Sequence, residues 1–165
     1  MVFKASLDQQ AKWITAVVML INAIAIGTLL FIDISQFGLI VAAVLLVAAF
    51  IISWGFSTTQ YILSGDSIVI KRPFGNKSIP VSTISKAEKI ERADLRYSIR
   101  TLGNGGFLGY YGSYYNKKLG KMQWYATNLN NAILLTTNTS KKMIITPDEH
   151  QKFLHQIAPL MPNTL

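Results

Sequence analysis

The titratable side chains of the sequence form few groups that could carry out chemistry. Cysteine is absent, which excludes thiolate nucleophiles, thiolate metal sites and disulfides. His150 and His155 are five residues apart; on a helix they face different directions and are expected to be exposed, whereas a zinc pair needs positions i and i+4. Glu88, Glu91 and Asp94 alternate with lysine and arginine, a pattern typical of a charge-balanced surface. We therefore expect no catalytic residues, no metal site and no cofactor.

A glycine-rich segment runs from Gly103 to Gly112, and glycine-rich loops can cradle phosphate groups. A dinucleotide fingerprint that began at Gly103 would need glycine at position 108, where Leu108 stands, and no alternating strand–helix pattern surrounds the segment. The Lys-Ser/Thr pair of a P-loop is also missing. We expect a long loop between strands, in which the glycines allow positive φ and whose length favours contact with a ligand or partner.

Aromatic and basic residues alternate just beyond these glycines, from Tyr110 to Tyr125. Such a patch suits an anionic membrane surface, where each lysine contributes about 1 kcal/mol, and it would also suit single-stranded nucleic acid. Alternatively, several aromatic rings belong to the core and the lysines are solvated at a hairpin turn. A chain tethered to a membrane by its apolar stretches would meet lipid before nucleic acid, which favours lipid as the ligand of this patch. The predicted binding residues are Gly103, Gly105, Gly106, Phe107, Gly109, Tyr110, Tyr111, Tyr114, Lys117, Lys118 and Lys121.

Two uncharged apolar stretches predict a pair of membrane-spanning helices. Residues 13–32 and 37–56 each contain 20 residues without a charged side chain, and about 20 helical residues cross a ~30 Å hydrocarbon core. Only residues 33–36 separate them, so the helices must be antiparallel neighbours. A cleavable signal peptide fits less well, because its apolar core is usually about 7–15 residues long. Buried core helices fit poorly too, because the rest of the chain could hardly enclose two helices that are apolar on every face.

The positive charge lies after these stretches. Lys4 and Lys12 offset Asp8 and Asp33, so the formal net charge of +8 belongs to residues 57–165. Lysines precede the first stretch and basic residues follow the second, whereas the connection has neither lysine nor arginine. The positive-inside tendency predicts that both termini are cytoplasmic. The expected organisation is a cytoplasmic segment at 1–12, a transmembrane hairpin at 13–56 and a second domain at 57–165.

Asn22 is the one polar amide expected deep in the hairpin. If residues 32 and 37 face each other, Asn22 lies level with Val47, in a stretch without a polar side chain. An amide in hydrocarbon gains about 0.5–2 kcal/mol from a hydrogen bond. Asn22 is therefore predicted either to bond across a subunit interface or to bond to its own helix backbone.

The remaining chain reads mostly as strands separated by turns. Tyr61 and Leu63 alternate with polar residues, and Ile68 and Ile70 do the same after the Gly65-Asp66 turn, which indicates a hairpin. The stretch from 85 to 100 allows either a strand with a loop or a helical turn. The expected strands are 59–64, 67–72, 77–81, 120–127, 132–137 and 141–146.

The chain is expected to end in an amphipathic helix. Thr146-Pro147-Asp148-Glu149 has the composition of a capping box, with Thr146 as the N-cap and proline at the first helical position. Phe153, Ile157 and Leu160 follow at helical spacing and form an apolar stripe. A partly open sheet of six or seven strands that this helix closes is the simplest arrangement.

Several segments are similar to the bacterial PH-domain proteins that carry two membrane spans before a pleckstrin-homology-like domain. The resemblance covers about residues 57–160, extends in layout to the hairpin, and is most distinctive at 100–112. It implies a PH-like barrel of six to seven antiparallel strands with a C-terminal helix, in a bacterial inner-membrane protein without known catalytic residues. The segments that carry it are 61–68, 79–81 with Ile84, 100–112, 125–127 and 145–148.

The resemblance also bears on the ligand. Many eukaryotic PH domains bind phosphoinositides through basic residues around the first strand turn, but here that turn carries Asp66 and the first strand has no lysine or arginine. Specific phosphoinositide binding is therefore not expected. We expect a noncatalytic, membrane-anchored module that binds a protein partner or self-associates near anionic lipid, without nucleic acid. The alternative is a small membrane enzyme or an accessory subunit of a transporter or secretion complex.

Overall fold

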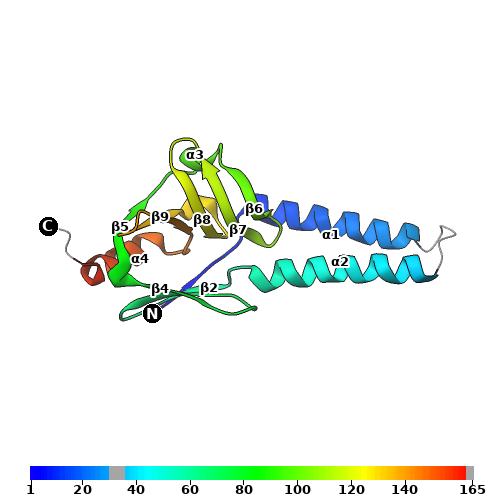
Figure 1. Cartoon of the computed structure of the whole chain (residues 1–165), viewed down its shortest axis with the longest axis horizontal. Helices are drawn as coiled ribbons and strands as arrows, with labels where there is room; N and C mark the ends of the chain where they lie inside the picture. The colour runs from blue at the N-terminus through cyan, green and yellow to red at the C-terminus, as the bar shows by residue number, and fades with distance from the viewer. Residues whose placement is uncertain (30–35, 163–165) are drawn as a thin grey trace.

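The computed structural model describes residues 1–29 and 36–162. Two long helices lie side by side and project from one end of a β-rich domain, and the N-terminus and the last helix lie towards the other end (Figure 1). Residues 33–35 of the expected helix connection at 33–36, and the end of the first expected span at 30–32, fall outside the described residues.

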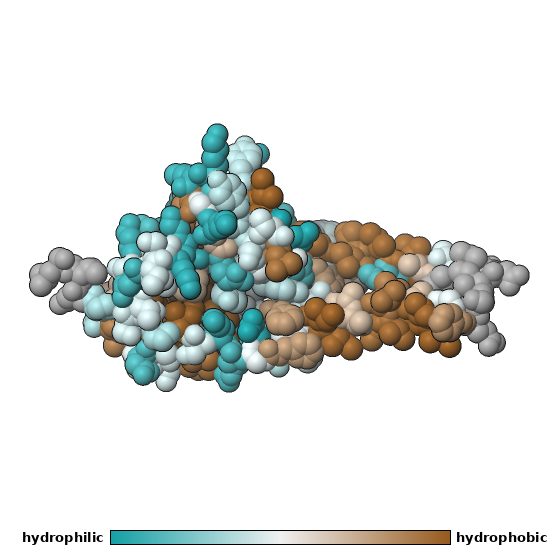
Figure 2. Space-filling model, in the orientation of Figure 1, coloured by the Kyte–Doolittle hydropathy of each residue, from teal (hydrophilic) through white to brown (hydrophobic). Residues whose placement is uncertain are grey.

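The projecting helices are α1 (Gln9–Leu29) and α2 (Gln36–Phe56). Both are long and apolar enough to cross a membrane, and only 6% of the first apolar window and 0% of the second are buried within the molecule. Their visible surface is largely apolar, whereas that of the domain is largely hydrophilic (Figure 2). The expected pair of N-terminal apolar helices is confirmed, and the domain does not enclose them as core helices.

The domain contains two sheets, in agreement with the expected β-rich PH-like fold. The four-stranded sheet has the order β1-β2-β3-β4, and the six-stranded sheet has the order β5-β9-β10-β8-β7-β6. The strands of the first sheet are β1 (Val2–Lys4), β2 (Gln60–Ser64), β3 (Ser67–Lys71) and β4 (Lys77–Pro80). Those of the second are β5 (Ile84–Lys89), β6 (Ile99–Gly106), β7 (Gly109–Asn116), β8 (Gly120–Ala126), β9 (Ile133–Thr137) and β10 (Lys142–Ile145).

Short helices complete the domain. The stretch that allowed two interpretations contains both: β5 is followed by the single-turn helix α3 (Arg92–Leu95) before β6 begins. The C-terminal helix is α4 (His150–Ile157). Three 3₁₀ turns are η1 (Val81–Thr83), η2 (Leu129–Asn131) and η3 (Ala158–Leu160).

The N-terminal residues belong to the domain and are not a separate segment. In β1, Val2 pairs with Ile62 and Phe3 pairs with Tyr61. Phe3 is 1% exposed, and its ring centroid lies 5.1 Å from that of Phe153 in α4. A three-residue strand whose partner lies after both long helices leaves no periodic signal in the sequence. The domain therefore holds the chain on both sides of the helix pair.

One strand pair departs from the expected antiparallel pattern. β10 pairs with β9 antiparallel and with β8 parallel, with Ile144 opposite Trp124. The turn η2 carries the chain from β8 past the position of β10 to β9, and the β9–β10 hairpin then returns β10 to the space between them. Sequence periodicity does not encode which neighbour a strand chooses, so this parallel pair was not foreseen.

Tyr61 links the two sheets from inside the core. Its side chain is 0% exposed, its hydroxyl donates to the Tyr125 carbonyl at 2.6 Å, and it accepts the Thr146 backbone N–H at 3.0 Å. Burial raises the pKa of Tyr61 to about 12. The sheet-to-sheet contact thus depends on a neutral phenol.

The expected N-cap at Thr146 is wrong. The Thr146 hydroxyl accepts the backbone N–H of Thr127 at 2.8 Å, so it is used inside the core, and α4 begins later, with Glu149 at its N-cap position. The apolar stripe is only partly as expected: Phe153 and Ile157 are fully buried, whereas Leu160 is exposed. The capping pattern failed because a buried strand end competes for the same hydroxyl.

Candidate functional site

The Gly/Tyr segment forms a β-hairpin and not the long loop expected from its glycines. β6 and β7 pair from Ile99–Tyr115 to Gly106–Gly109, and residues 107 and 108 form the turn. Gly103 lies opposite Gly112. Their φ angles are +112° and +115°, and a Cβ on either residue would collide with the backbone of the other strand. Glycine is rare in strands, which is why the composition indicated a loop.

The turn of this hairpin packs against both long helices. The Leu108 N–H donates to the Thr15 hydroxyl of α1 at 2.9 Å, and the Phe107 ring lies edge-on to Phe50 of α2 at 6.0 Å. Gly106 has φ +125°, and a side chain there would collide with α1. Phe107 and Gly106, which were predicted to contact a partner, therefore contact the helices of their own chain.

Asp8 connects α1 to the domain. The residue is 4% exposed, and its Oδ1 accepts the Ala11 N–H at 2.7 Å, which caps the first turn of α1. The same carboxylate accepts the Tyr110 hydroxyl at 3.1 Å and the Leu129 N–H at 3.3 Å, and the Arg92 guanidinium lies 3.5 Å away. One buried carboxylate thus ties the helix start to three elements of the domain.

Aromatic residues attach α2 in the same way. The Phe74 N–H, after β3, donates to the Gly55 carbonyl at 2.8 Å, and a side chain at Gly55 would collide with the Phe74 ring. The Phe74 ring packs edge-on against Trp54 at 6.3 Å and Phe56 at 6.1 Å. Phe56 also lies 6.2 Å from Tyr111. Because both helices are attached at several points, the domain has a fixed orientation relative to the helix pair.

The predicted tyrosines divide between core and surface. Tyr110 and Tyr114 are each 5% exposed, and Tyr114 stacks on Trp124 at 3.9 Å. Burial raises the pKa of Tyr114 to about 12, and burial together with the nearby Asp8 carboxylate raises the pKa of Tyr110. Both phenols therefore remain neutral and serve packing. Tyr111 is half-buried and, as described, contacts α2.

The predicted lysines lie at the other end of the hairpin strands. Lys117 and Lys118 are in the exposed β7–β8 turn and Lys121 follows in β8. β7 has eight residues, and at about 3.4 Å per residue this turn is roughly 25 Å from the turn that touches the helices. Lys118 is paired with Asp94, and the partnership lowers the pKa of Asp94. The structure therefore separates the lysines from the predicted glycine and aromatic contacts.

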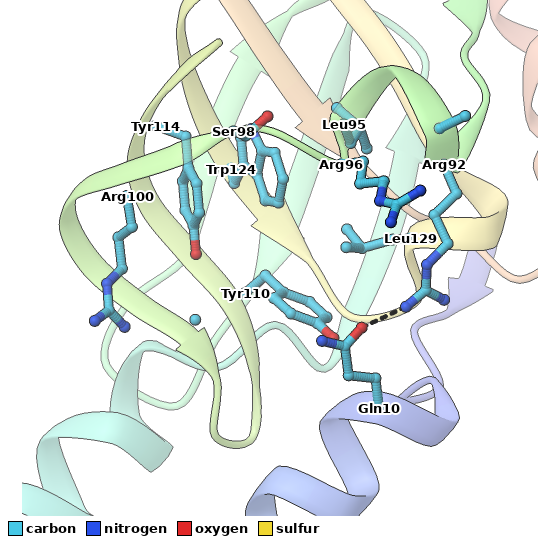
Figure 3. A pocket seen from close by; sticks show the side chains of 12 residues that line it. Gln10, Arg92, Leu95, Arg96, Ser98, Arg100, Tyr110, Tyr114, Trp124 and Leu129 are labelled. Carbon is cyan, nitrogen blue, oxygen red and sulfur yellow. Dashed lines mark hydrogen bonds between the residues drawn. The ribbon is translucent and has the colours of Figure 1, made fainter.

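A cavity of about 850 Å³ opens between α3, the β6–β8 face and the first turn of α1. Three arginines line it, and no carboxylate is among its lining residues: the lining set is Gln10, Arg92, Ala93, Leu95, Arg96, Ser98, Arg100, Gly105, Tyr110, Tyr114, Trp124 and Leu129. Figure 3 shows Arg92 and Arg96 at one end, Arg100 at the other, and the stacked aromatic rings between them. Aromatic rings form part of the wall, most of the accessible lining is polar, and the charge on the lining is positive.

The three arginines differ in their partners. Arg92 reaches Asp8, Asn130 at 3.2 Å and the side chain of Gln10 in α1. Arg96 lies over the Tyr97 ring at 5.5 Å. Within residues 1–29 and 36–162, no carboxylate forms an ion pair with Arg96 or Arg100. Trp124 also lines the cavity, and its indole N–H is buried without a hydrogen-bond acceptor among these residues.

Sequence reasoning missed this cavity and the Asp8 contacts. Arg92, Arg96 and Arg100 recur every four residues, which was the available signal, but neighbouring Glu91 and Asp94 made the segment look like a charge-balanced surface. Asp8 stands just before the first apolar helix, in a position typical of an N-cap. Its contacts with residues about a hundred positions later could not be inferred from spacing.

Asn22 follows the second of its two predicted alternatives. Its side-chain amide donates to the Val18 carbonyl of its own helix at 2.7 Å. It also lines an apolar groove of about 420 Å³ between α1 and α2, which Phe107 borders. Association through Asn22 with a second subunit stays a prediction.

The described part of the chain contains no group of three His, Cys, Asp or Glu side chains that could hold a metal ion. His155 is exposed as expected, but the expectation is wrong for His150, which is half-buried, with both ring nitrogens buried and without a partner among the described residues. It lies at the start of α4, where the turn before the helix folds back on the domain.

A family model described as Bacterial PH domain matches residues 59–160. The match spans the domain from β2 to η3 and omits α1, α2 and the N-terminal strand β1. No curated protein and no solved structure gives a significant match to the chain.

Proposed function

The chain belongs to the bacterial PH domain family, and from this premise we propose that it is a noncatalytic, membrane-anchored binding module. In this proposal α1 and α2 cross the bacterial inner membrane, and the domain lies at the cytoplasmic face. There it engages a protein partner or a second copy of itself, next to anionic lipid.

The exposure of α1 and α2 supports the anchoring. Helices that are apolar on all sides are normally buried in a protein core or in a membrane, and the domain covers almost none of their surface. Trp13 near the start of α1 and Trp54 near the end of α2 are exposed at the domain end of the pair. Tryptophan is favoured at the membrane–water interface, so both fit the same interface.

The attachment of both helices to the domain is the observation that carries the proposal. The Asp8 cap fixes α1, the contact of Phe74 with Gly55 fixes α2, and the turn at Phe107 touches both. A flexible tether would need none of these contacts. They support a domain whose face and height above a bilayer are constant, as a platform for assembly requires.

Extraction and topology measurements test the anchoring. The chain has no cysteine, so Gln151→Cys, at an exposed position of α4, introduces a single thiol. We expect the full chain to resist carbonate extraction, and a membrane-impermeant maleimide to label Gln151→Cys in inverted vesicles but not in intact cells. Release by carbonate would refute anchoring, and labelling in intact cells would refute the cytoplasmic orientation.

Self-association is tested separately by light scattering of the full chain in nonionic detergent. A protein mass of two or more chains that does not dissociate on dilution would support a homo-oligomer. A monomer under all conditions would leave a different protein as the partner.

A further inference from the structure

We propose that the arginine-lined cavity binds a phosphate-bearing anion. The cavity lies between α3, β6–β8 and α1, and no residue of the turn between β2 and β3, where Asp66 stands, is part of its lining. The inference rests on the proposed function only for placing the cavity beside a membrane; the cavity itself belongs to the domain.

The charge of the cavity favours an anion. Arg92 is neutralised by Asp8, whereas Arg96 and Arg100 have no carboxylate partner among the described residues. Guanidinium groups match phosphate oxygens in a planar, two-pronged geometry and are less strongly hydrated than ammonium groups. The stacked Tyr114 and Trp124 rings form an aromatic part of the wall, and a charge pair beside apolar groups is stronger than one in water.

Among the lining residues, Trp124 carries a hydrogen-bond donor without an acceptor among the described residues. The Tyr110 hydroxyl donates to Asp8 and the Tyr114 hydroxyl donates to the Asn104 carbonyl, so both are already used. The Trp124 indole N–H is buried and unused. An unpaired buried donor is unfavourable. Arg96 and Arg100 are exposed, and their guanidinium groups are the donors that an anion entering the cavity can reach.

The position of the cavity determines what can reach it. Gln10 lines it from the first turn of α1 and is bonded to Arg92 (Figure 3). Gln10 precedes Trp13 by three residues, or about 4.5 Å along a helix. If Trp13 lies at the membrane interface, the cavity opens at the depth of lipid headgroups. A phosphate there can come from a phospholipid headgroup or from a soluble phosphate compound.

Fluorescence of Trp124 provides a direct test. Trp13→Phe with Trp54→Phe leaves Trp124 as the single tryptophan, since the chain has three. In one arm, this variant in nonionic detergent micelles is titrated with inorganic phosphate, against chloride at equal ionic strength. In the other arm, it is compared in nanodiscs of phosphatidylcholine with and without phosphatidylglycerol. A response to inorganic phosphate identifies a soluble source, and a response to phosphatidylglycerol alone identifies a lipid headgroup.

Two charge-matched double variants decide whether the cavity is the site. Arg96→Gln with Arg100→Gln removes the unpaired cavity charges, and Lys117→Gln with Lys121→Gln removes the same charge from exposed positions at the far end of the hairpin. We expect about tenfold weaker binding for the arginine variant and less than about twofold for the lysine variant. Equal losses in the two variants, or no Trp124 response in either arm, would overturn the proposal. Neither result depends on topology in cells, so anchoring could fail or hold independently.

Discussion

Replacement of Asp8 by alanine should detach α1 from the domain and destabilise the fold. The carboxylate is 1% exposed and accepts hydrogen bonds from Ala11, Tyr110 and Leu129. Loss of an N-cap costs about 1 kcal/mol, and a buried donor left unpaired costs about 1–3 kcal/mol. Arg92 is 39% exposed and can be hydrated, so its ion pair adds little. We expect Asp8→Ala to lower the free energy of unfolding by about 3 kcal/mol.

This loss can be measured by thermal unfolding of the full chain in nonionic detergent, followed by near-UV circular dichroism. For a domain of this size, about 3 kcal/mol corresponds to a fall in Tm of about 10 °C. Asp8→Asn retains one acceptor oxygen and should lie between Asp8→Ala and the wild type. Glu88→Gln, which breaks an exposed pair with Lys86, is the matched control and should shift Tm by no more than about 2 °C. A Tm for Asp8→Ala equal to that of the control would refute the reasoning.

Three further predictions concern the packing of the domain. Gly103→Ala should lower the free energy of unfolding by at least about 2 kcal/mol, because its Cβ would collide with the backbone of the opposite strand. Gly65→Ala, also at positive φ but in open space, is the control and should lower it by less. Denaturant unfolding measures both values. Phe107→Ala should leave the Tm of the domain nearly unchanged but speed amide hydrogen exchange at Leu108, whose N–H bonds to α1. Unchanged exchange would show that the Phe107 ring does not hold the hairpin turn against the helices. Burial raises the pKa of Tyr61 to about 12 from an ordinary 10.0, so its contribution to stability is complete below pH 10 and is lost as pH rises towards 12. Tyr61→Phe should reduce that alkaline loss, and an identical alkaline profile would show that other tyrosines control it.

The elements that the sequence predicted best are those whose signal is local. Uncharged stretches identify α1 and α2, and alternation around Gly65 identifies the β2–β3 hairpin, because each pattern lies within one element and its nearest neighbour. The family resemblance supplied the PH-like architecture, which periodicity alone leaves open. Phe3 was not identified as a core residue, because its strand is three residues long and its partner lies beyond two helices.

The candidate site was less predictable, because the properties of its residues depend on distant partners. The sequence left open whether Tyr110 and Tyr114 belong to a binding surface or to the core, and the fold places them over β8 and beside Asp8. The lysines of the same segment lie at the opposite end of the hairpin, because an extended strand advances about 3.4 Å per residue. Arg96 has no ion-pair partner among the described residues, and its acidic neighbour Asp94 is paired with Lys118 instead. The composition of this segment shows acidic and basic side chains in similar numbers, whereas the ion pairs in the fold decide which side chains keep an unpaired charge.

The rigid junction limits how binding at the domain could be communicated. Because Asp8 caps α1 and also bonds to Tyr110 on the wall of the cavity, any movement of Tyr110 would pull on the first turn of the helix. Arg92 reaches the same carboxylate and lines the same cavity. An anion drawn to Arg92 would compete with Asp8 for the guanidinium, and Asp8 could not move without losing its cap. The cavity and the start of α1 therefore share contacts through Asp8 and through Gln10, which lines the cavity from the helix itself.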